Sequence, residues 1–205
     1  MNKTVIGVLA SGRGSNLQAI VDAIEAGRLA VTVGVVISDN PEANVLKRLA
    51  GSDIPAVCID RRQFACRQDF EAAVAEELNV RHVELVVLAG FMRILGRYFI
   101  DRFAGKIMNI HPSLLPAFPG ENAQLQALQY GVKVSGCTVH FVDEGMDTGP
   151  IILQEAVPVM EDDTEETLSE RILHAEHILY PRALALYCEG RLCMEGRRVY
   201  IKRIE

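Results

Sequence analysis

The chain lacks several features that mark particular classes of protein. It has 205 residues, no tryptophan and only 6% aromatic residues. Its five cysteines are odd in number and show no CxxC spacing, so neither a disulfide framework nor a zinc site is expected. The net charge of −6 argues against the strongly positive surface that binds a nucleic acid. One small phosphate still fits, because a few backbone amides at a helix end are sufficient to bind it.

The chain also lacks a long hydrophobic run. Its first apolar run covers residues 4–10 and is much shorter than the roughly 20 residues that a membrane helix needs. No signal-peptide cleavage site follows it. We therefore expect a buried first strand, a cytoplasmic protein and no membrane partner.

Short apolar runs alternate with amphipathic segments along the first half. The runs have the length of strands buried on both faces and cover residues 4–11, 31–39, 54–60 and 84–90. Helical patterns separate them at residues 17–27, 41–51 and 63–80. This alternation predicts an α/β, Rossmann-like fold, with a mostly parallel twisted sheet and helices on both faces. No linker or repeat interrupts the chain, so a single domain over residues 1–205 is expected.

The second half predicts further helices and two hairpins. Helical patterns cover residues 91–105, 121–131 and 164–190, and a strand pattern covers 106–110. The runs at 134–143 and 150–159 are joined by a short connector, which predicts an antiparallel hairpin near one end of the sheet. The alternating tail predicts a last small hairpin. Thr164 is the expected N-cap of the long helix, and Pro181 is expected to kink or interrupt it.

The segment SGRGSN, residues 11–16, stands between the first expected strand and the first expected helix. Its glycines allow a sharp turn, and Ser15 and Asn16 offer donors at the positive end of the helix. It is not a GxGxxG motif, because Leu17 stands at the third glycine position. The pattern favours a site for the phosphate of a mononucleotide. A tight turn with a helix cap is the alternative.

The segment KIMNIHPSLLPAFPG, residues 106–120, places an amide and an imidazole at the end of an expected strand. Asn109 and His111 are two residues apart, so they share one face of that strand. Asp147 lies in the glycine-flanked connector of the expected hairpin. A carboxylate beside His111 would raise the pKa of the imidazole, and the group would then suit an oxyanion. A turn cap, a hydrogen-bonded loop histidine and a solvated acidic turn explain the same residues.

Together these segments resemble the formyltetrahydrofolate-dependent formyltransferases, and among them the branch that formylates glycinamide ribonucleotide in de novo purine (IMP) synthesis. The resemblance rests on SGRGSN, VVLAGFMRIL, NIHPSLLPAFPG, VHFVDEGMDTGPII and HAEHILYP, and it covers nearly the whole chain. It implies formyl transfer from 10-formyltetrahydrofolate, a co-substrate, to the amine of glycinamide ribonucleotide. It further implies small-molecule partners, no metal, no nucleic acid, and a monomer or homodimer. Residues 1–105 would form a nucleotide-phosphate-binding half, and residues 106–205 a catalytic and folate-binding half.

The resemblance implies a role for each matching residue. The catalytic residues would be Asn109, His111 and Asp147. Glycinamide ribonucleotide would be bound by Gly14, Ser15, Asn16 and Glu176. Folate would be bound by Arg67, Met92, Arg93, Ile94, Leu95, Asn109, Asp143, Glu144, Gly145, Met146 and Asp147. Asn122 and Gln124 stand where many members have histidine, so no auxiliary role of such a histidine is carried over. Without the resemblance, Glu176 would be interpreted as an exposed glutamate on a helix.

Other functions remain open at the level of sequence. Methionyl-tRNA formyltransferase has a C-terminal tRNA-binding domain, and formyltetrahydrofolate hydrolase has an N-terminal regulatory domain; neither is expected here. A non-catalytic or dinucleotide-dependent Rossmann-type protein would have no need of the Asn109, His111 and Asp147 set. His140, within TVHFV, is expected to be a hydrogen-bonded structural histidine. His174 and His177 lack further ligands nearby, so no metal site is expected there.

Overall fold

The computed structural model describes residues 3–203. The chain forms two compact units, one ending at Met108 and the other beginning at Asn109. The boundary falls inside strand β5 (Ile107–His111). The first unit contains the SGRGSN loop, and the second contains Asn109, His111 and Asp147.

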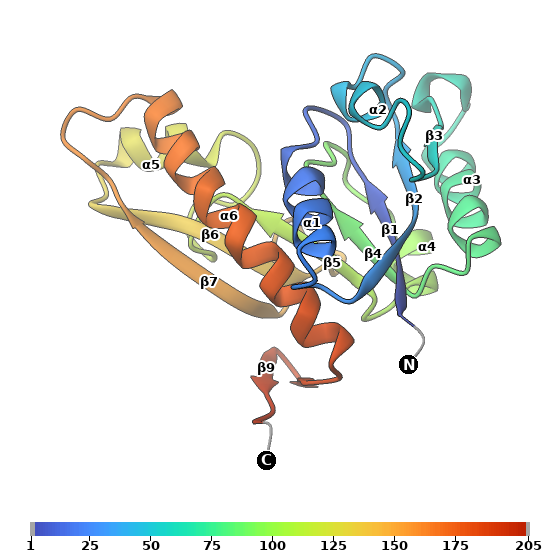
Figure 1. The fold of residues 1–205 in the computed structure, drawn as a ribbon. Helices are drawn as coiled ribbons and strands as arrows, with labels where there is room; N and C mark the ends of the chain where they lie inside the picture. The colour runs from blue at the N-terminus through green and yellow to red at the C-terminus, as the bar shows by residue number, and fades with distance from the viewer. Residues whose placement is uncertain (1–2, 204–205) are drawn as a thin grey trace. The chain divides into compact units, whose positions relative to one another are not determined.

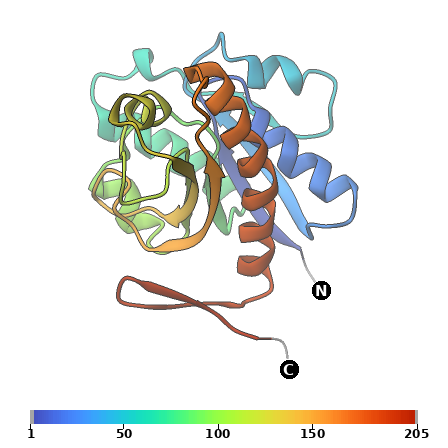
Figure 2. The same ribbon diagram turned by 90° about the vertical axis from the view of Figure 1, so that its left-hand side faces the viewer.

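The first unit has a parallel sheet with helices on both faces. Its strands lie in the order β3-β2-β1-β4, which belongs to the doubly wound α/β class. The strands are β1 (Thr4–Leu9), β2 (Val31–Ser38), β3 (Ala56–Cys58) and β4 (Leu85–Leu88). The helices are α1 (Ser15–Glu25), α2 (Asn44–Arg48), the 3-10 helix η1 (Arg61–Gln63), α3 (Arg67–Val80) and α4 (Arg97–Arg102). Helix α1 covers one face of this sheet, and α3 and α4 cover the other (Figure 2). The predicted parallel sheet is confirmed.

The core of the first unit explains the continuous apolar runs. Ile6 and Val8 of β1 and Val86 and Val87 of β4 are all fully buried. A strand covered by helices on both sides needs apolar residues at every position, because neither face meets water. Each such side chain contributes about 1.5–3 kcal/mol on burial. Packing therefore fixes β1 and β4, and the loops that follow them are positioned by these strands.

The second unit contains two hairpins and a long helix. Strands β6 (Val134–Phe141) and β7 (Ile151–Pro158) pair antiparallel, which confirms the predicted hairpin. Strands β8 (Leu192–Glu195) and β9 (Arg198–Ile201) form the expected hairpin at the end of the chain. Helix α5 is Ala123–Tyr130, and α6 is Glu165–Cys188. Helix α6 packs against β6 and β7 (Figure 1).

Helix α6 differs from expectation at one of two points. Thr164 is its N-cap, as predicted: the Thr164 hydroxyl accepts from the Thr167 amide, and the Thr167 hydroxyl accepts from the Thr164 amide. Of the two outcomes expected at Pro181, the interruption is wrong, because the helix continues through this residue. Pro181 and its neighbours Tyr180 and Ala183 are buried. Packing of this buried face offsets the backbone hydrogen bond that proline cannot donate.

Two predicted helices are less than half as long as expected. Helix α2 covers five residues rather than 41–51. The Asn40 side chain accepts from the Glu42 amide, and this local turn delays the start of the helix. Helix α4 begins only at Arg97 rather than near residue 91, because side chains from other elements bind the backbone amides of Met92 and Gly96. Among residues 3–203, no helix is long and apolar enough to span a membrane.

Candidate functional site

The SGRGSN loop joins β1 to α1 and positions the N-terminus of that helix. Gly14 is the N-cap, with φ of 75°, and a Cβ at this position would lie 2.7 Å from Val45 Cγ2. A glycine is therefore favoured both by conformation and by space. Ser15 and Asn16 open the helix, and the cap supplies no side-chain hydrogen bond. The first amides of α1 and its positive dipole end suit an anion such as phosphate.

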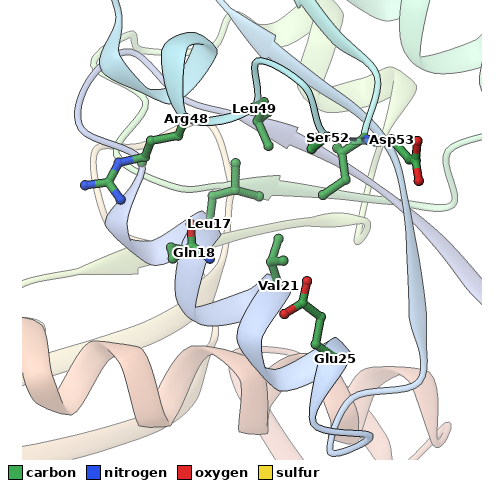
Figure 3. A pocket seen from close by; sticks show the side chains of 10 residues that line it. Leu17, Gln18, Val21, Glu25, Arg48, Leu49, Ser52 and Asp53 are labelled. Atoms are coloured by element: carbon green, nitrogen blue, oxygen red, sulfur yellow. Dashed lines mark hydrogen bonds between the residues drawn. The ribbon is translucent and has the colours of Figure 1, made fainter.

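A cavity of about 320 Å³ lies in the same unit, between α1 and the segment that follows α2 (Figure 3). Leu17 and Val21 line it from α1, and Leu49 lines it from the opposite side. Of the SGRGSN loop, only Gly14 contributes to its wall. The cavity therefore runs along the side of α1 and does not cover the N-terminal amides.

The stretch after β4 is an irregular loop held by side chains from the first unit. Ser11 binds both sides of its start, because the Ser11 amide donates to the Gly90 carbonyl at 3.0 Å and the Ser11 hydroxyl accepts from the Met92 amide at 2.9 Å. Arg93 forms an ion pair with Asp39, whose side chain is almost fully buried. The side chains of Met92 and Ile94 are 74% and 60% exposed, whereas Leu95 is buried. The SGRGSN loop and the 92–95 stretch are thus in direct contact within this unit.

In the second unit, the structure brings Asn109, His111 and Asp147 together. His111 Nδ1 lies 3.3 Å from Asp147 Oδ2, and His111 is 5% exposed. His111 Nε2 lies 2.8 Å from the Phe118 carbonyl. A carbonyl can only accept, so Nε2 carries a proton in this arrangement. The Gly120 amide donates to Asp147 Oδ2 at 2.8 Å, so the segment 118–120 contacts both members of the pair.

His140 belongs to the same cluster, although the sequence predicts only a hydrogen-bonded structural histidine. Its Nδ1 lies 2.8 Å from the Phe141 carbonyl, so Nδ1 is the protonated nitrogen. Its Nε2 then accepts from Asn109 Nδ2 at 3.2 Å, and it lies 3.7 Å from Asp147 Oδ1. His140 is hydrogen-bonded, as expected, and it also orients the Asn109 amide. Its position near the end of β6, just before the connector that contains Asp147, was the available signal.

The electrostatics of this cluster correct one expectation. Burial lowers the pKa of His111 below its ordinary value, and it outweighs the upward effects of the Asp147 carboxylate and the Phe118 carbonyl. The raised pKa predicted from the sequence is wrong, because the carboxylate by itself raises the pKa but the desolvation of the buried ring has the larger effect. Burial alone would raise the pKa of Asp147. The His140 ring, the Gly120 amide and His111 together outweigh it, so the pKa of Asp147 is lowered below its ordinary value. The resting cluster therefore favours an ionised Asp147 and a neutral His111.

The loop after His111 is fixed to β6 and β7 by a polar network. The Thr138 hydroxyl donates to the Ser113 carbonyl at 2.7 Å and accepts from the Leu115 amide at 3.0 Å. Gln154 Nε2 donates to the Leu115 carbonyl at 2.9 Å. Thr138 and Ser113 are fully buried. These bonds satisfy backbone groups that no helix or strand pairs, and they hold the loop in place beside the cluster.

Two further parts of the predicted site are Glu176, on helix α6, and the 143–147 loop. Glu176 is 6% exposed on α6, so the interpretation as an exposed glutamate is wrong. Burial raises the pKa of Cys137 to about 12, and the nearby Glu176 carboxylate adds to this effect. In the 143–147 loop, Asp143 Oδ1 accepts from the Gly145 amide and the Thr148 hydroxyl, while Glu144, Gly145 and Met146 are exposed.

The two positions where many family members have histidine lie at the start of α5. Asn122 is its N-cap, with φ of 55°, and Gln124 lies in its first turn. Within residues 3–203, no set of three or more His, Cys, Asp or Glu side chains is grouped so as to hold a metal ion.

The chain is similar to known formyltransferases over most of its length. The formyl transferase family profile matches residues 4–184. Phosphoribosylglycinamide formyltransferase of Bacillus subtilis (strain 168) is 46% identical over 86% of this chain and 91% of its own length. The crystal structure of glycinamide ribonucleotide transformylase 1 from Symbiobacterium toebii is 54% identical, covers 97% of this chain and 94% of its own, and has a TM-score of 0.95.

Some relatives are much longer proteins. The trifunctional purine biosynthetic protein adenosine-3 of Drosophila melanogaster is 48% identical over 90% of this chain, and this chain spans 14% of its length. The likeness to the Symbiobacterium toebii structure confirms the predicted fold class. By sequence profile, by identity and by fold, the chain belongs to the formyl transferase family.

Proposed function

We propose that this chain transfers the formyl group of 10-formyltetrahydrofolate to the amine of glycinamide ribonucleotide. The products are formylglycinamide ribonucleotide and tetrahydrofolate, in a step of de novo purine (IMP) synthesis. The observation that carries the proposal is the cluster of Asn109, His111, His140 and Asp147, in a chain of the formyl transferase family. The names of the relatives from Bacillus subtilis and Symbiobacterium toebii support glycinamide ribonucleotide as the acceptor.

The reaction forms one carbon–nitrogen bond and breaks another. The amine nitrogen attacks the formyl carbon, the bond from that carbon to folate N10 breaks, and the proton lost by the amine ends on N10. Asn109 has a second amide N–H beyond the one given to His140, and it donates this to the formyl oxygen. His111 Nε2–H donates to the same oxygen, which replaces the Phe118 carbonyl as its acceptor. Both donors stabilise the negative charge of the tetrahedral intermediate.

Asp147 has two tasks in this proposal. Its Oδ2 faces His111 Nδ1 and accepts a hydrogen bond from that nitrogen once the ring is protonated. As negative charge develops on the formyl oxygen, that charge and the Asp147 carboxylate together favour the protonated ring. His111, neutral at rest, takes up at Nδ1 the proton that the amine loses on attack, and this proton passes to N10 when the bond from the formyl carbon to N10 breaks. Asp147, beside His111, is also assigned the task of guiding the proton from the amine towards N10.

Substrate binding is assigned to the residues that match the family. Glycinamide ribonucleotide is bound by Gly14, Ser15, Asn16 and Glu176. Folate is bound by Arg67, the 92–95 stretch, Asn109 and the 143–147 loop. The exposed apolar side chains of Met92, Ile94 and Met146 support this assignment, because a flat aromatic ring can bury them. The net charge of −6 supports small-molecule partners over nucleic acid. We further propose a cytoplasmic enzyme that works as a monomer or homodimer.

The experiment that tests the proposal is steady-state kinetics on variants of the cluster. Asn109→Ala, His111→Ala and Asp147→Asn should each lower kcat at least about tenfold, because each removes a group that acts on the developing charge. His174→Ala, on the exposed side of α6, is the matched control and should keep the kcat of the unaltered protein. A His111→Ala variant that is folded and fully active would overturn the role assigned to His111.

A further inference from the structure

Helix α3 contains a buried carboxylate that the proposed mechanism does not use. Glu71 lies one turn into this helix and is 2% exposed. A carboxylate is rarely buried unless it is paired, because removing it from water is costly. Its position therefore calls for strong partners, and the structure provides two.

The first partner is the backbone at the end of the 92–95 stretch. Glu71 Oε1 accepts from the Gly96 amide at 2.6 Å, and Gly96 is the N-cap of α4. Hydrogen bonds to ionised acceptors are shorter and stronger than those between neutral groups. Ser11 holds the other end of the stretch at Met92. The backbone that is assigned to folate is thus fixed at both ends by side chains.

The second partner is Arg67, one turn earlier on the same helix. Arg67 Nε lies 3.6 Å from Glu71 Oε1, and the Arg67 side chain is 58% exposed while that of Glu71 is 3% exposed. The carboxylate therefore sits beneath the guanidinium, which has its other face open to solvent. In this position Glu71 limits where the Arg67 side chain can go.

Gly96 shows how closely these groups fit together. A Cβ at position 96 would lie 2.9 Å from Arg67 Nε and from Glu71 Oε2. Such a distance is too short for a methyl group beside a charged group. The absence of a side chain at Gly96 is what allows the guanidinium, the carboxylate and the loop backbone to meet at one point.

We propose that Glu71 is a positioning residue for the folate co-substrate. Its one carboxylate fixes two folate-binding elements together: the backbone that ends the 92–95 stretch and the guanidinium of Arg67. Arg67 then presents its open N–H groups to a carboxylate of the folate, in the bidentate geometry that arginine favours. This inference rests on the proposed function, because it takes folate as the ligand of these elements.

The test separates the binding of the two substrates and asks whether Glu71 acts through Arg67. Glu71→Gln keeps an oxygen acceptor for the Gly96 amide but removes the charge beside Arg67. It should raise the KM for 10-formyltetrahydrofolate about fivefold or more, and leave the KM for glycinamide ribonucleotide within about twofold. Glu77→Gln is the matched control, because Glu77 pairs with Arg81 on the same helix at 2.9 Å. It should leave both constants unchanged.

A double-mutant cycle distinguishes positioning from general destabilisation. In an Arg67→Ala background, Glu71→Gln should raise the folate KM by less than about twofold, because the Gln side chain keeps an acceptor for the Gly96 amide and the guanidinium that the lost charge held is gone. An equal increase in both backgrounds, or an equal increase in both KM values, would overturn the proposal. Calorimetric titration of the unaltered protein with tetrahydrofolate shows whether the proposed function itself fails. If tetrahydrofolate does not bind, the proposed function itself is wrong, and the proposal for Glu71 is overturned with it.

Discussion

Two effects shift the pKa of His111 in opposite directions. Its two ring nitrogens face the Asp147 carboxylate and the Phe118 carbonyl, an arrangement that suits a doubly protonated ring. Burial favours the neutral ring, and its effect is the larger one. A residue of this kind changes its charge readily when a third group, such as a developing oxyanion, enters the site. The lowered pKa is therefore consistent with a donor that becomes charged during the reaction.

The lowered pKa of His111 has a consequence for stability. Between its unfolded value of 6.5 and the lower folded value, the unfolded chain binds a proton that the folded chain does not. The free energy of unfolding should therefore fall as the pH drops below 6.5, by at most about 1.4 kcal/mol per pH unit from this group. His111→Asn should lose this part of the pH dependence. Urea unfolding at a series of pH values measures both proteins, and identical profiles would contradict the assignment.

Single residues also show which properties of the site could be predicted from the sequence and which could not. Asn109 and His111 could be identified because a strand places alternate residues on one face. The direction of the His111 pKa could not, because desolvation depends on every atom that covers the ring. His140 and Glu176 were underestimated for the same reason: their burial comes from packing that local sequence does not show.

The loop before α1 requires a glycine at position 14, and this requirement can be measured. Gly14→Ala places a side chain at φ of 75° and against Val45, so the free energy of unfolding should fall by about 1–2 kcal/mol or more. The KM for glycinamide ribonucleotide should rise, because the first amides of α1 shift. Gly12→Ala is the control in the same loop: its Cβ would meet nothing within 4 Å, and its stability should change by less than about 0.5 kcal/mol. Equal losses in both variants would contradict this account.

The elements that were predicted correctly are those with a strong local pattern. The buried parallel strands, the β6–β7 hairpin and the Thr164 cap all follow from short sequence signals. The helix expected at 91–105 was too long because side chains distant in sequence bind the backbone within residues 91–96. Ser11 and Glu71 bind the amides of Met92 and Gly96, and no periodicity within the loop reveals such bonds.

At the scale of the whole molecule, the proposed function divides the tasks between the two compact units. The first unit contains the amides assigned to the phosphate, together with the 92–95 stretch. The second contains the cluster assigned to the formyl group. Holding two substrates in a reactive arrangement can itself supply a large share of the rate. Turnover of the proposed enzyme therefore requires both substrates to be present.

In the proposed reaction, the formyl group passes to an amine and not to water. The direct measurement is the loss of the formyl group from 10-formyltetrahydrofolate, followed with and without glycinamide ribonucleotide. We expect turnover only when glycinamide ribonucleotide is present, with one formylglycinamide ribonucleotide formed per tetrahydrofolate released. Equal turnover without the amine would indicate a hydrolase, and no turnover in either case would indicate a protein that binds nucleotide without catalysis; either result would contradict the account.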